Sequence, residues 1–600
     1  MLGAVSCIEY ERMMRLELPS PRTRRICWVA VYTAQRNIQI LVSLLKQYGI
    51  RDVVLSPGSR NMGFVHSVED DRFFRCYSVV DERSAAYVAI GISLETNAPV
   101  AISCTSSQAT RNYIPGMTEA YYRGTPLVVI NADYKYSSIG QGLMQTVEQM
   151  DLPADTQKKS VRLPVINDEA GATYVARLVN EALLEVNHHG TGPVHIDVET
   201  VEHWPGGVEV LPQAKKIDRY VRGDELPAIG QRKVLVVVGE HAPFSDAEKR
   251  ALDAFSLAHN CVVYTNHLSN YRGPRSLHAN LFLEGMDGPT FRDIAPDVLI
   301  TIGQQHGDYA LEGKLVTADY EHWRVNRDGK IRDTYGKLRK VFEMADEDFF
   351  NGYATQGTET NHSPFYRAWQ QKLMARQIPD VPLSHAFVAQ ILSPLIPAGS
   401  SVHFGILSSL RNWNYFDIPA HVECHSNVAA FGIDGCVSTF IGQTIATEKK
   451  TFLIVGDLAL FYDMNVLGNK HIKKNARIVL VNNAGGGEFQ LYTNAASKFG
   501  ESSNRHIAAA GHFGSAQAWV ESMGWSYMPV RSKAELVDNA EKLVCDSDRP
   551  VLMEVFTTMR DDSDAVRMLV AAHASMSLKG KLVASLSPEA KRRIKKLLGR

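Results

Sequence analysis

Asp457 and Asn483 are the two side chains whose types and spacing point most directly to chemistry. Asp457 follows the apolar run Phe452–Val455, and Asn483 follows the apolar run Ile478–Val481. Each run predicts a buried strand, and the loops after parallel strands meet at the carboxyl edge of a sheet, where ligands bind. The interval between the two residues is long enough for one crossover connection, with a helix expected over Asp463–Lys473.

This pair of oxygen-bearing side chains suits a hard cation. A carboxylate, an amide oxygen and a backbone carbonyl are ligands that Mg²⁺ accepts, and the ion takes its remaining ligands from phosphates and water. The glycines that follow Asn483 allow the backbone to approach a diphosphate closely. Since Gly-Asp and Asn-Asn are also common in turns, two ordinary turns are the alternative interpretation.

The elements that must position these residues alternate between strand and helix along most of the chain. This alternation predicts an α/β fold made of three doubly wound α/β domains. A first helix is expected between Thr33 and Gly49. The other expected helices are Ser84–Leu94, Ala109–Tyr122 and Asp246–Ala258, and the expected strands are Val53–Leu55, Cys76–Val80, Val100–Cys104, Leu127–Asn131, Val234–Val238, Val262–Tyr264 and Val298–Ile302.

Changes in composition suggest where the domains begin and end. Residues 1–30 read as an N-terminal extension, and the three domains are expected at 31–205, 231–345 and 365–575. Polar linkers are expected up to residue 231 and over Asp346–Pro364. Residues 576–600 end in a basic amphipathic helix from Ser587. This helix could contact a membrane or an anion, or could simply be solvated or pack in an oligomer.

The overall composition excludes several classes of protein. The 600 residues carry 64 basic and 65 acidic side chains, so no global charge favours nucleic acid or membrane as a partner. The eight cysteines contain no C-x-x-C pair, which predicts reduced thiols in place of a disulfide framework or zinc site. No apolar run approaches the ~18 residues of a membrane span. We expect a cytoplasmic protein.

Three motifs, taken together, resemble one enzyme family. They are SPGSR at Ser56–Arg60, DERSAAYVAIG at Asp81–Gly91, and GIDG at Gly432–Gly435 followed by the Gly-Asp and Asn-Asn loops. The combination is similar to the thiamine diphosphate (ThDP)-dependent enzymes, and within them to the SEPHCHC synthases of menaquinone biosynthesis. The resemblance is strong in the first and last domains and weak in the middle one. It implies a pyrimidine-binding domain, a central domain and a diphosphate-binding domain, in that order.

The resemblance assigns a catalytic role to Glu82. In the family, the glutamate of the D-E-R-S motif hydrogen-bonds the aminopyrimidine ring of ThDP, so that the cofactor's own imino group can remove the proton from the thiazolium ring. An ordinary glutamate at a helix start is the alternative. Because related enzymes build each site between two subunits, the resemblance also implies a homodimer or homotetramer.

Further cofactor-binding residues follow from the same resemblance. Ile433 matches the bulky apolar residue that holds the cofactor in its bent shape, although a plain core isoleucine is the alternative. Asp457, Asn483 and the carbonyl oxygen of Gly485 match the Mg²⁺ ligands. The remaining positions implied to contact the diphosphate are Gly456 and Gly486.

The resemblance also implies a set of substrate-binding residues. The synthases use 2-oxoglutarate and isochorismate, whose carboxylates are bound by arginines. Ser59, Arg60, Gln145, Arg411 and Arg272 match such positions, and Arg60, Gln145 and Arg411 are also expected to take part in catalysis. For Arg60 and Arg411, purely structural ion pairs are the alternative.

The chain departs from the family pattern on this substrate side. The family's D-R-P after the third strand is Asp133-Tyr134-Lys135 here, Met144 replaces an asparagine, and Val428-Ala429 stand where the family has Arg-Gly. Glu488 replaces an apolar residue after the triple glycine. Leaving a bound carboxylate without its arginine costs about 2 to 5 kcal/mol. Tight use of both original substrates is therefore not expected unless Lys135 or another base substitutes.

We therefore expect an enzyme that uses ThDP and Mg²⁺ to decarboxylate a 2-oxo acid and transfer the resulting acyl anion to an acceptor, with an altered substrate. Glu488 could act as a general acid/base or bind a hydroxylated or cationic group, or it could be an exposed loop glutamate. The alternatives are an orthodox SEPHCHC synthase, a 2-oxo acid decarboxylase without an acceptor, and a catalytically silent scaffold. An FAD site is not excluded, although the middle third has no G-x-G-x-x-G motif.

Overall fold

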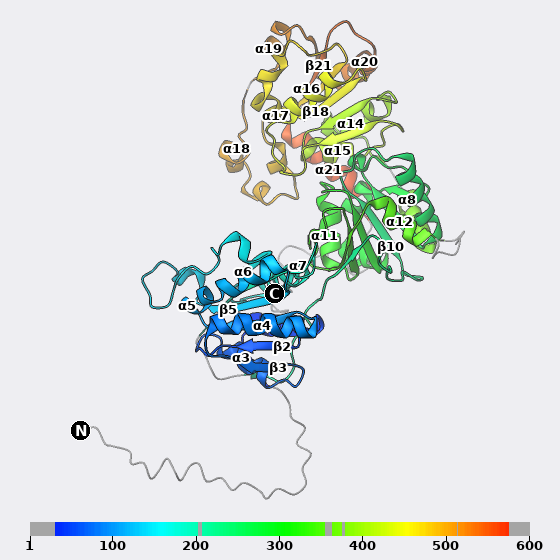
Figure 1. Ribbon diagram of the computed structural model, residues 1–600. Helices are drawn as coiled ribbons and strands as arrows, with labels where there is room; N and C mark the ends of the chain where they lie inside the picture. The colour runs from blue at the N-terminus through cyan, green and yellow to red at the C-terminus, as the bar shows by residue number, and fades with distance from the viewer. Residues whose placement is uncertain (1–30, 202–206, 355–362, 375–377, 513, 575–600) are drawn as a thin grey trace, which may run out of the picture. The chain divides into compact units, whose positions relative to one another are not determined.

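The computed structural model describes residues 31–201, 207–354, 363–374, 378–512 and 514–574 (Figure 1). The chain forms two compact units, one up to Lys216 and one from Ile217 onward. The first unit holds one parallel sheet and the second unit holds two. The expected extension at 1–30 and the expected basic helix near the C-terminus lie outside the described residues.

The first unit is built on a six-stranded parallel sheet with the order β3-β2-β4-β5-β7-β6. A short antiparallel pair, β1 and β8, lies apart from it. Helix α4 begins after Asp81, whose side chain accepts a hydrogen bond from the backbone N–H of Ser84, and it ends at Asn97 in the left-handed conformation. The elements of this unit are β1 (Tyr32–Thr33), α2 (Arg36–Gln47), β2 (Asp52–Leu55), α3 (Met62–Glu69), β3 (Arg75–Ser78), α4 (Glu82–Thr96), β4 (Val100–Cys104), α5 (Gln108–Asn112), α6 (Ile114–Arg123), β5 (Leu127–Asp133), η1 (Tyr136–Ser138), η2 (Ala154–Thr156), β6 (Lys159–Leu163), α7 (Glu169–Glu185), β7 (Val194–Glu199) and β8 (Gly207–Val208).

The second unit begins with a seven-stranded parallel sheet, whose order is β12-β11-β10-β13-β14-β15-β9. Its chain order reverses between β10 and β13, as in a doubly wound sheet. Its elements are β9 (Asp218–Val221), β10 (Val234–Val238), α8 (Asp246–Ala258), β11 (Cys261–Thr265), η3 (His267–Ser269), β12 (Ser276–His278), α9 (Asn280–Glu284), α10 (Gly288–Asp293), β13 (Val298–Ile302), α11 (Tyr309–Thr317), β14 (Glu321–Val325), β15 (Leu338–Glu343), α12 (Asp346–Ala354) and α13 (Pro364–Met374).

The last sheet has six parallel strands in the order β17-β16-β18-β19-β21-β20. Its elements are α14 (His385–Leu392), η4 (Ser393–Leu395), β16 (Ser401–Phe404), α15 (Ser408–Trp413), β17 (Glu423–Ser426), α16 (Cys436–Ala446), β18 (Thr451–Gly456), α17 (Asp457–Tyr462), η5 (Met464–Gly468), β19 (Ala476–Asn482), η6 (Gly487–Gln490), η7 (Ala495–Phe499), α18 (Ser502–His506), α19 (Gln517–Ser522), β20 (Ser526–Val530), α20 (Lys533–Val544), β21 (Val551–Phe556) and α21 (Met559–Ala572).

The first and last sheets share one topology. If the six strands of each are numbered along the chain, both sheets have the order 2-1-3-4-6-5. The winding direction changes between the first and third strands, which are β2 and β4 in one sheet and β16 and β18 in the other, and doubly wound folds bind ligands at this point of the carboxyl edge. The SPGSR loop follows β2, and Asp457 follows β18. The topology therefore brings the predicted site residues to the positions where such folds bind ligands.

The middle of strand β19 is apolar on both faces because helices cover both sides of the sheet. In β19, Val479 and Val481 pack into one hydrophobic cluster, while Ile478 and Leu480 pack into the cluster on the opposite face. Each of these side chains is fully buried, which contributes about 1.5 to 3 kcal/mol per residue. This alternation holds the strand, and with it the Asn483 loop, in a fixed register.

The fold confirms the predicted α/β class, and several predicted elements need correction. The helix expected over Asp463–Lys473 is wrong: α17 ends at Tyr462, and only a 3₁₀ turn, η5, follows. The Asp463 side chain instead accepts hydrogen bonds from the backbone N–H and hydroxyl of Ser438, both at 2.7 Å, and the Gly468-Asn469 pair disfavours a helix. The helix expected over Ala109–Tyr122 is two helices, because Pro115 starts α6.

The expected linkers also contain regular structure. Strand β9 lies in the first linker and pairs with β15 at the edge of the middle sheet. Helix α12 lies in the second linker and begins with three acidic residues, Asp346, Glu347 and Asp348, which favour a helix N-terminus. No helix in the part of the chain described here is long and apolar enough to cross a membrane.

Candidate active site

Asp457 lies at the start of α17, directly after β18, and its side chain is buried. Its Oδ1 accepts a hydrogen bond from the Leu458 backbone N–H at 2.7 Å. Its Oδ2 accepts one from the Gly485 N–H and lies 3.0 Å from Nε2 of His512. Burial raises the pKa of Asp457, and these hydrogen bonds oppose the rise. The loop after β18 and the loop after β19 are therefore in direct contact, as the sequence predicted.

Asn483 lies in the loop that contacts this carboxylate through Gly485, and its side chain has an unused acceptor. Its Nδ2 donates to Oδ2 of Asp562 at 2.7 Å, while its Oδ1 is buried without a hydrogen-bond partner among the described residues. Burial raises the pKa of Asp562 to about 6. A buried amide oxygen with no donor, fixed next to a buried aspartate, fits one ligand position of a hard cation.

The glycines after Asn483 allow the loop to pack tightly. Ala484 adopts a left-handed backbone conformation with φ of 63°. A Cβ atom on Gly485 would lie 2.8 Å from Cα of Ala510, and the Gly486 N–H donates to the carbonyl oxygen of Ala508 at 2.6 Å. The Gly485 carbonyl, expected to bind Mg²⁺, accepts a hydrogen bond from the Gly487 N–H at 3.0 Å. Side chains are thus excluded from the loop that was expected to face a diphosphate.

Ile433 is not a core residue. Its side chain is 36% exposed and lies two residues after Phe431, which adopts a left-handed conformation with φ of 60°. Gly435, also left-handed, then starts α16. An exposed isoleucine in a strained loop beside the Asp457 sheet edge fits a residue that supports a ligand better than one that fills the core.

Arg411 and Glu488 form a two-point ion pair. Arg411 Nη1 lies 2.7 Å from Glu488 Oε2, and Nη2 lies 3.0 Å from Oε1. The two side chains are only 15% and 17% exposed. Burial alone would lower the pKa of Arg411. The hydrogen bonds and the charge of Glu488 outweigh this effect, so the pKa lies above its ordinary value. Arg411 therefore forms an ion pair, as the alternative interpretation of the sequence allowed. Its partner, Glu488, is the residue that departs from the family pattern.

More acidic groups surround this pair. The wall beside Arg411 includes Glu284, Asp308 and Tyr309, and burial raises the pKa of Glu284. Tyr309 and Phe431 also line a cavity of about 400 Å³ at the carboxyl edge of the middle sheet. The pocket around Arg411 is therefore not a cationic surface of the kind that binds two carboxylates.

Arg272 does not join this group in the described contacts. It is exposed and donates to the carbonyl oxygen of Ile418. Its role in substrate binding stays a prediction.

In the first unit, the loop after β2 carries Ser59 and Arg60. A Cβ atom on Gly58 would lie 2.2 Å from Cβ of Thr105, so this loop packs tightly against the loop after β4. Ser59 is exposed, and the Arg60 guanidinium lies over the ring of Tyr134, 3.5 Å from its centroid. Tyr134, which stands in place of the family's arginine, therefore covers one face of the predicted substrate-binding arginine.

Gln145 lies in the long loop between β5 and β6. It is exposed and has a φ of 62°, a left-handed conformation that is unfavourable for a residue other than glycine. Its neighbour Met144 is 88% exposed. Strain of this kind concentrates at functional sites, where the surrounding structure holds it.

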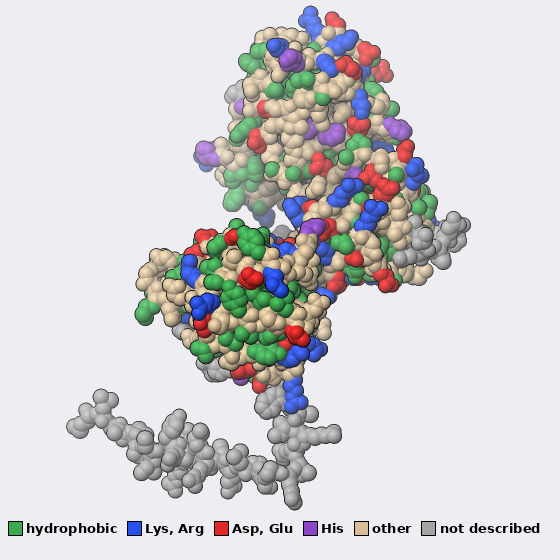
Figure 2. Space-filling model, viewed as in Figure 1, with side chains coloured by type: hydrophobic (Ala, Val, Ile, Leu, Met, Phe, Trp, Pro, Cys, Tyr) green, Lys and Arg blue, Asp and Glu red, His purple; other side chains and the backbone are tan. Residues whose placement is uncertain are grey.

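Glu82 is the first residue of α4, and its Oε2 accepts a hydrogen bond from Asn112 Nδ2 at 3.4 Å. The same helix presents apolar side chains to solvent. The exposed apolar residues on α4 and the neighbouring α6 are Tyr87, Val88, Leu94, Tyr121 and Tyr122. Figure 2 shows hydrophobic side chains gathered on the face of the first unit where α4 and α6 lie in Figure 1. Apolar surface that gathers in this way is typical of an interface.

Comparison with known proteins agrees with this geometry. Residues 36–152 match the family described as thiamine pyrophosphate enzyme, N-terminal TPP binding domain. The chain is 35% identical over 555 residues to a 2-succinyl-5-enolpyruvyl-6-hydroxy-3-cyclohexene-1-carboxylate (SEPHCHC) synthase of Phocaeicola vulgatus, covering 90% of this chain and 98% of that protein. The protein belongs to the SEPHCHC synthase family of ThDP-dependent enzymes. Enzymes of the same name from Bacteroides thetaiotaomicron (35% over 551 residues, covering 89% and 98%) and Flavobacterium johnsoniae (27% over 546 residues, covering 88% and 97%) are also similar.

This SEPHCHC synthase family member contains site residues that the sequence did not reveal. His512 contacts Asp457, and Asp562 holds Asn483, but both are distant in the chain and lie in no motif. The only available signal for His512 was its place between glycines at Gly511 and Gly514. Asp562 follows a helix cap at Thr558, so it reads as an ordinary helix-start residue.

Proposed function

We propose that this enzyme uses ThDP and Mg²⁺ to decarboxylate a 2-oxo acid and transfer the acyl group to an acceptor, and that its substrate differs from those of its relatives. The observation that carries the cofactor assignment is the buried Oδ1 of Asn483, which has no hydrogen-bond partner among the described residues and lies in the loop whose Gly485 N–H contacts the Asp457 carboxylate. Together with the Gly485 carbonyl, these groups would hold Mg²⁺, and the ion would hold the diphosphate.

The chain's own residues then have separate tasks. When bound, ThDP would supply the carbon nucleophile and the electron sink that decarboxylation of a 2-oxo acid requires. Glu82 donates or accepts the proton at the pyrimidine ring nitrogen. Ile433 would contact the cofactor, and the tightly packed glycine loop leaves no room for side chains where the diphosphate would be held. Gln145 and Ser59 orient the substrate.

We further propose that the working form is a homodimer or homotetramer, with Glu82 of one subunit serving the Mg²⁺ site of its partner. Two exposed apolar surfaces support this. One is the exposed apolar face of α4 and α6, with Glu82 at the start of α4, and the other includes the exposed Ile433, Phe489 and Tyr492 in the last sheet's part of the second unit. Burying such surfaces in an oligomer is favourable by about 25 cal/mol per Å² of apolar area.

The altered substrate follows from how the two arginines are engaged. Glu488 accepts hydrogen bonds from both terminal nitrogens of Arg411, the same two-point contact that a substrate carboxylate would make with this arginine. Arg60 is covered on one face by Tyr134. A dianionic substrate would have to displace a carboxylate that already makes two charge-assisted hydrogen bonds, which costs about 2 to 5 kcal/mol. We infer a substrate with a neutral or hydrogen-bond-donating group at the Arg411 position.

The second candidate is an orthodox SEPHCHC synthase that binds 2-oxoglutarate and isochorismate through other basic residues. It is favoured by the 35% identity over nearly the whole length of enzymes with that name. Lys135 is the substitute base that this alternative offers.

The experiment measures CO₂ release from a panel of 2-oxo acids with ThDP and Mg²⁺ present. Our proposal expects faster release from a monocarboxylic 2-oxo acid than from 2-oxoglutarate, with product formation that depends on an acceptor. Turnover of 2-oxoglutarate with isochorismate as the best pair would establish the orthodox synthase. Free aldehyde as the sole product would indicate a simple decarboxylase, and no CO₂ from any acid would indicate a silent scaffold.

A further inference from the structure

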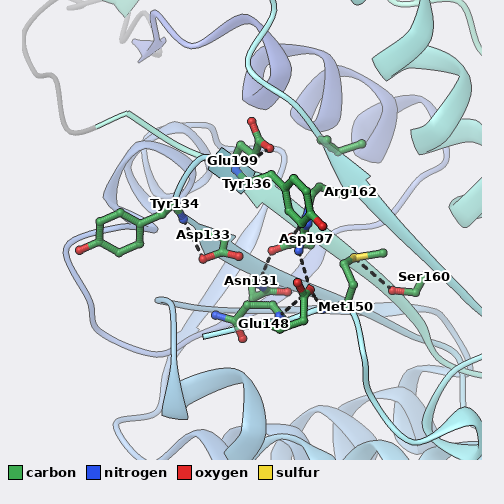
Figure 3. Close-up of polar contacts among 12 residues, drawn as sticks. Asn131, Asp133, Tyr134, Tyr136, Glu148, Met150, Ser160, Arg162, Asp197 and Glu199 are labelled. Atoms are coloured by element: carbon green, nitrogen blue, oxygen red, sulfur yellow. Dashed lines mark hydrogen bonds and ion pairs between the residues drawn. The ribbon is translucent and has the colours of Figure 1, made fainter. Parts of the chain in front are cut away.

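Arg162 contacts both limbs of the loop that carries Gln145. This loop leaves β5 after Asp133 and returns to the sheet near Met150 (Figure 3). On the outgoing limb, the Arg162 guanidinium lies over the ring of Tyr136, 4.6 Å from its centroid. On the returning limb, Nη2 of Arg162 donates to Oε1 of Glu148 at 2.8 Å. One side chain therefore closes the base of the loop.

A buried row of polar residues holds Arg162 itself in place. Arg162, Asp197 and Asn131 lie in register on the adjacent strands β6, β7 and β5. Nε of Arg162 donates to Oδ2 of Asp197 at 2.6 Å, and Nδ2 of Asn131 donates to Oδ1 of the same aspartate at 2.6 Å (Figure 3). Asp197 and Asn131 are fully buried, and Arg162 is 18% exposed. The guanidinium thus has a fixed orientation.

Backbone contacts fix the two limbs further. The Tyr136 N–H donates to Oε1 of buried Glu199 at 3.0 Å. Oε1 of Glu148 also accepts from the N–H groups of Gln149 and Met150, at 3.0 and 2.8 Å. These contacts hold the two ends of the loop, while residues 140–145 between them are exposed.

The loop connects this base to both substrate-side residues of the first unit. Tyr134, two residues before Tyr136, stacks on Arg60. Gln145, three residues before Glu148, is held in the left-handed conformation. A shift of the loop at Arg162 would therefore move both Tyr134, on which Arg60 stacks, and Gln145.

A buried ion pair of this kind is a weak source of stability, because the cost of removing charges from water offsets much of their attraction. Its stronger effect is to impose one geometry on the residues that it joins. Here those residues set the position of an exposed, strained loop. We propose that Arg162 is a positioning residue for the substrate, which acts by fixing the loop 134–149 so that Gln145 and Arg60 are correctly placed. This inference rests on the proposed function for the roles of Gln145 and Arg60.

The test compares Arg162→Met and Arg162→Lys with the wild-type enzyme, using the 2-oxo acid from the panel that releases CO₂ fastest. We expect Arg162→Met to raise KM at least about tenfold while the exchange of the ThDP C2 proton, which needs no substrate, stays within about twofold of wild type. Arg162→Lys retains the charge and should recover part of the loss. Hydrogen–deuterium exchange of the peptides over 134–150 should rise in Arg162→Met.

The coupling between Arg162 and Gln145 gives a readout that a merely structural role would not produce. If Arg162 acts through Gln145, the double variant Arg162→Met/Gln145→Ala should have nearly the same KM as Gln145→Ala alone. Arg177→Met is the matched control, because Arg177 forms an ion pair with Glu181 on α7 in the same unit and should leave KM unchanged.

Each result decides the question. An unchanged KM in Arg162→Met, or strictly multiplicative effects in the double variant, would overturn the positioning role. If Arg162→Met fails to fold, Glu148→Ala removes the contact of Arg162 with the returning limb and takes its place in the comparison. Absence of C2 exchange in the wild-type enzyme would instead refute the proposed function, while the loop exchange data would still test whether Arg162 fixes the loop.

Discussion

Glu488 occupies the Arg411 guanidinium through two hydrogen bonds of 2.7 and 3.0 Å, in a pocket where both side chains are largely buried. Glu488, which departs from the family pattern, is thus bound to Arg411, which matches it. Glu488 thus engages one N–H donor on each terminal nitrogen of the arginine that was expected to bind a substrate carboxylate, and this contact can be tested directly.

Glu488→Leu should release Arg411 for an external carboxylate. Removing one member of a buried ion pair costs about 3 to 5 kcal/mol of folding stability, so the variant should have a lower Tm than the wild type. Added 2-oxoglutarate should restore part of that Tm, because its carboxylate replaces the lost partner. Thermal denaturation with and without 2-oxoglutarate measures this.

Arg411→Met/Glu488→Leu is the control for Glu488→Leu, since it removes both charges and should be closer to wild-type stability without responding to 2-oxoglutarate. An equal Tm response of the wild type and Glu488→Leu to 2-oxoglutarate would show that Glu488 does not block the site.

Asp457→Asn should weaken Mg²⁺ binding. The substitution removes the charged ligand while keeping the size of the side chain, so the apparent Kd for Mg²⁺ in the presence of ThDP should rise at least about tenfold. Isothermal titration calorimetry measures the change, and Asp538→Asn on the exposed face of α20 serves as the matched control. Equal Mg²⁺ affinity in Asp457→Asn and the wild type would remove Asp457 from the metal site.

Asp133 should make stability depend on pH near neutrality. Burial, together with the charge of Asp197, raises the pKa of Asp133 to about 7. The ordinary aspartate pKa is about 3.9, so the folded state binds the proton more tightly than the unfolded state does. The stabilising effect of this proton is complete below the unfolded pKa and is lost as the pH rises toward 7.

Asp133→Asn should therefore match the wild-type Tm near pH 4 and exceed it at pH 8, because asparagine can still accept the hydrogen bond from the Tyr134 N–H without ionising. Thermal denaturation from pH 4 to pH 8 checks this, with the exposed Asp151→Asn as control. Parallel curves for Asp133→Asn and the wild type would contradict the raised pKa.

Glu82→Gln and Asp457→Asn should complement each other if the site lies between subunits. Each variant alone should be inactive, because every site lacks one residue. After the two are mixed, dissociated and reassembled, half of the dimers are mixed and each has one intact site, so about a quarter of the wild-type activity should return. No recovery, despite proven subunit exchange, would place both residues in a site within one chain.

The sequence predicted the strands and the loops at their carboxyl ends well, but it did not predict the polar residues that hold those loops in place. Strands such as Val234–Val238 and Val298–Ile302 were predicted to the residue, because a buried parallel strand is a continuous apolar run between polar loops. The contact between the loops of Asp457 and Asn483 followed from the same pattern.

What the sequence could not show were partners that meet through the fold alone. Arg162 and Asp197 are neighbours only because β6 and β7 pair in one register, and the chain order of these strands at the sheet edge is not a local property. Similarly, the sequence offered a catalytic role or an exposed loop position for Glu488 and did not predict its ion pair with Arg411 on α15. Long-range pairing of charged residues leaves no periodic signal in the chain.

The central claim is that Glu82 activates a thiamine cofactor held at the Asp457 and Asn483 edge. Exchange of the C2 proton of bound ThDP for deuterium, followed by NMR after rapid acid quench, tests it without any knowledge of the substrate. We predict that the wild-type enzyme with Mg²⁺ accelerates this exchange and that Glu82→Gln slows it at least about a hundredfold while still binding ThDP. Exchange in the wild-type complex at the rate of the free cofactor, or an unchanged rate in Glu82→Gln, would contradict the account.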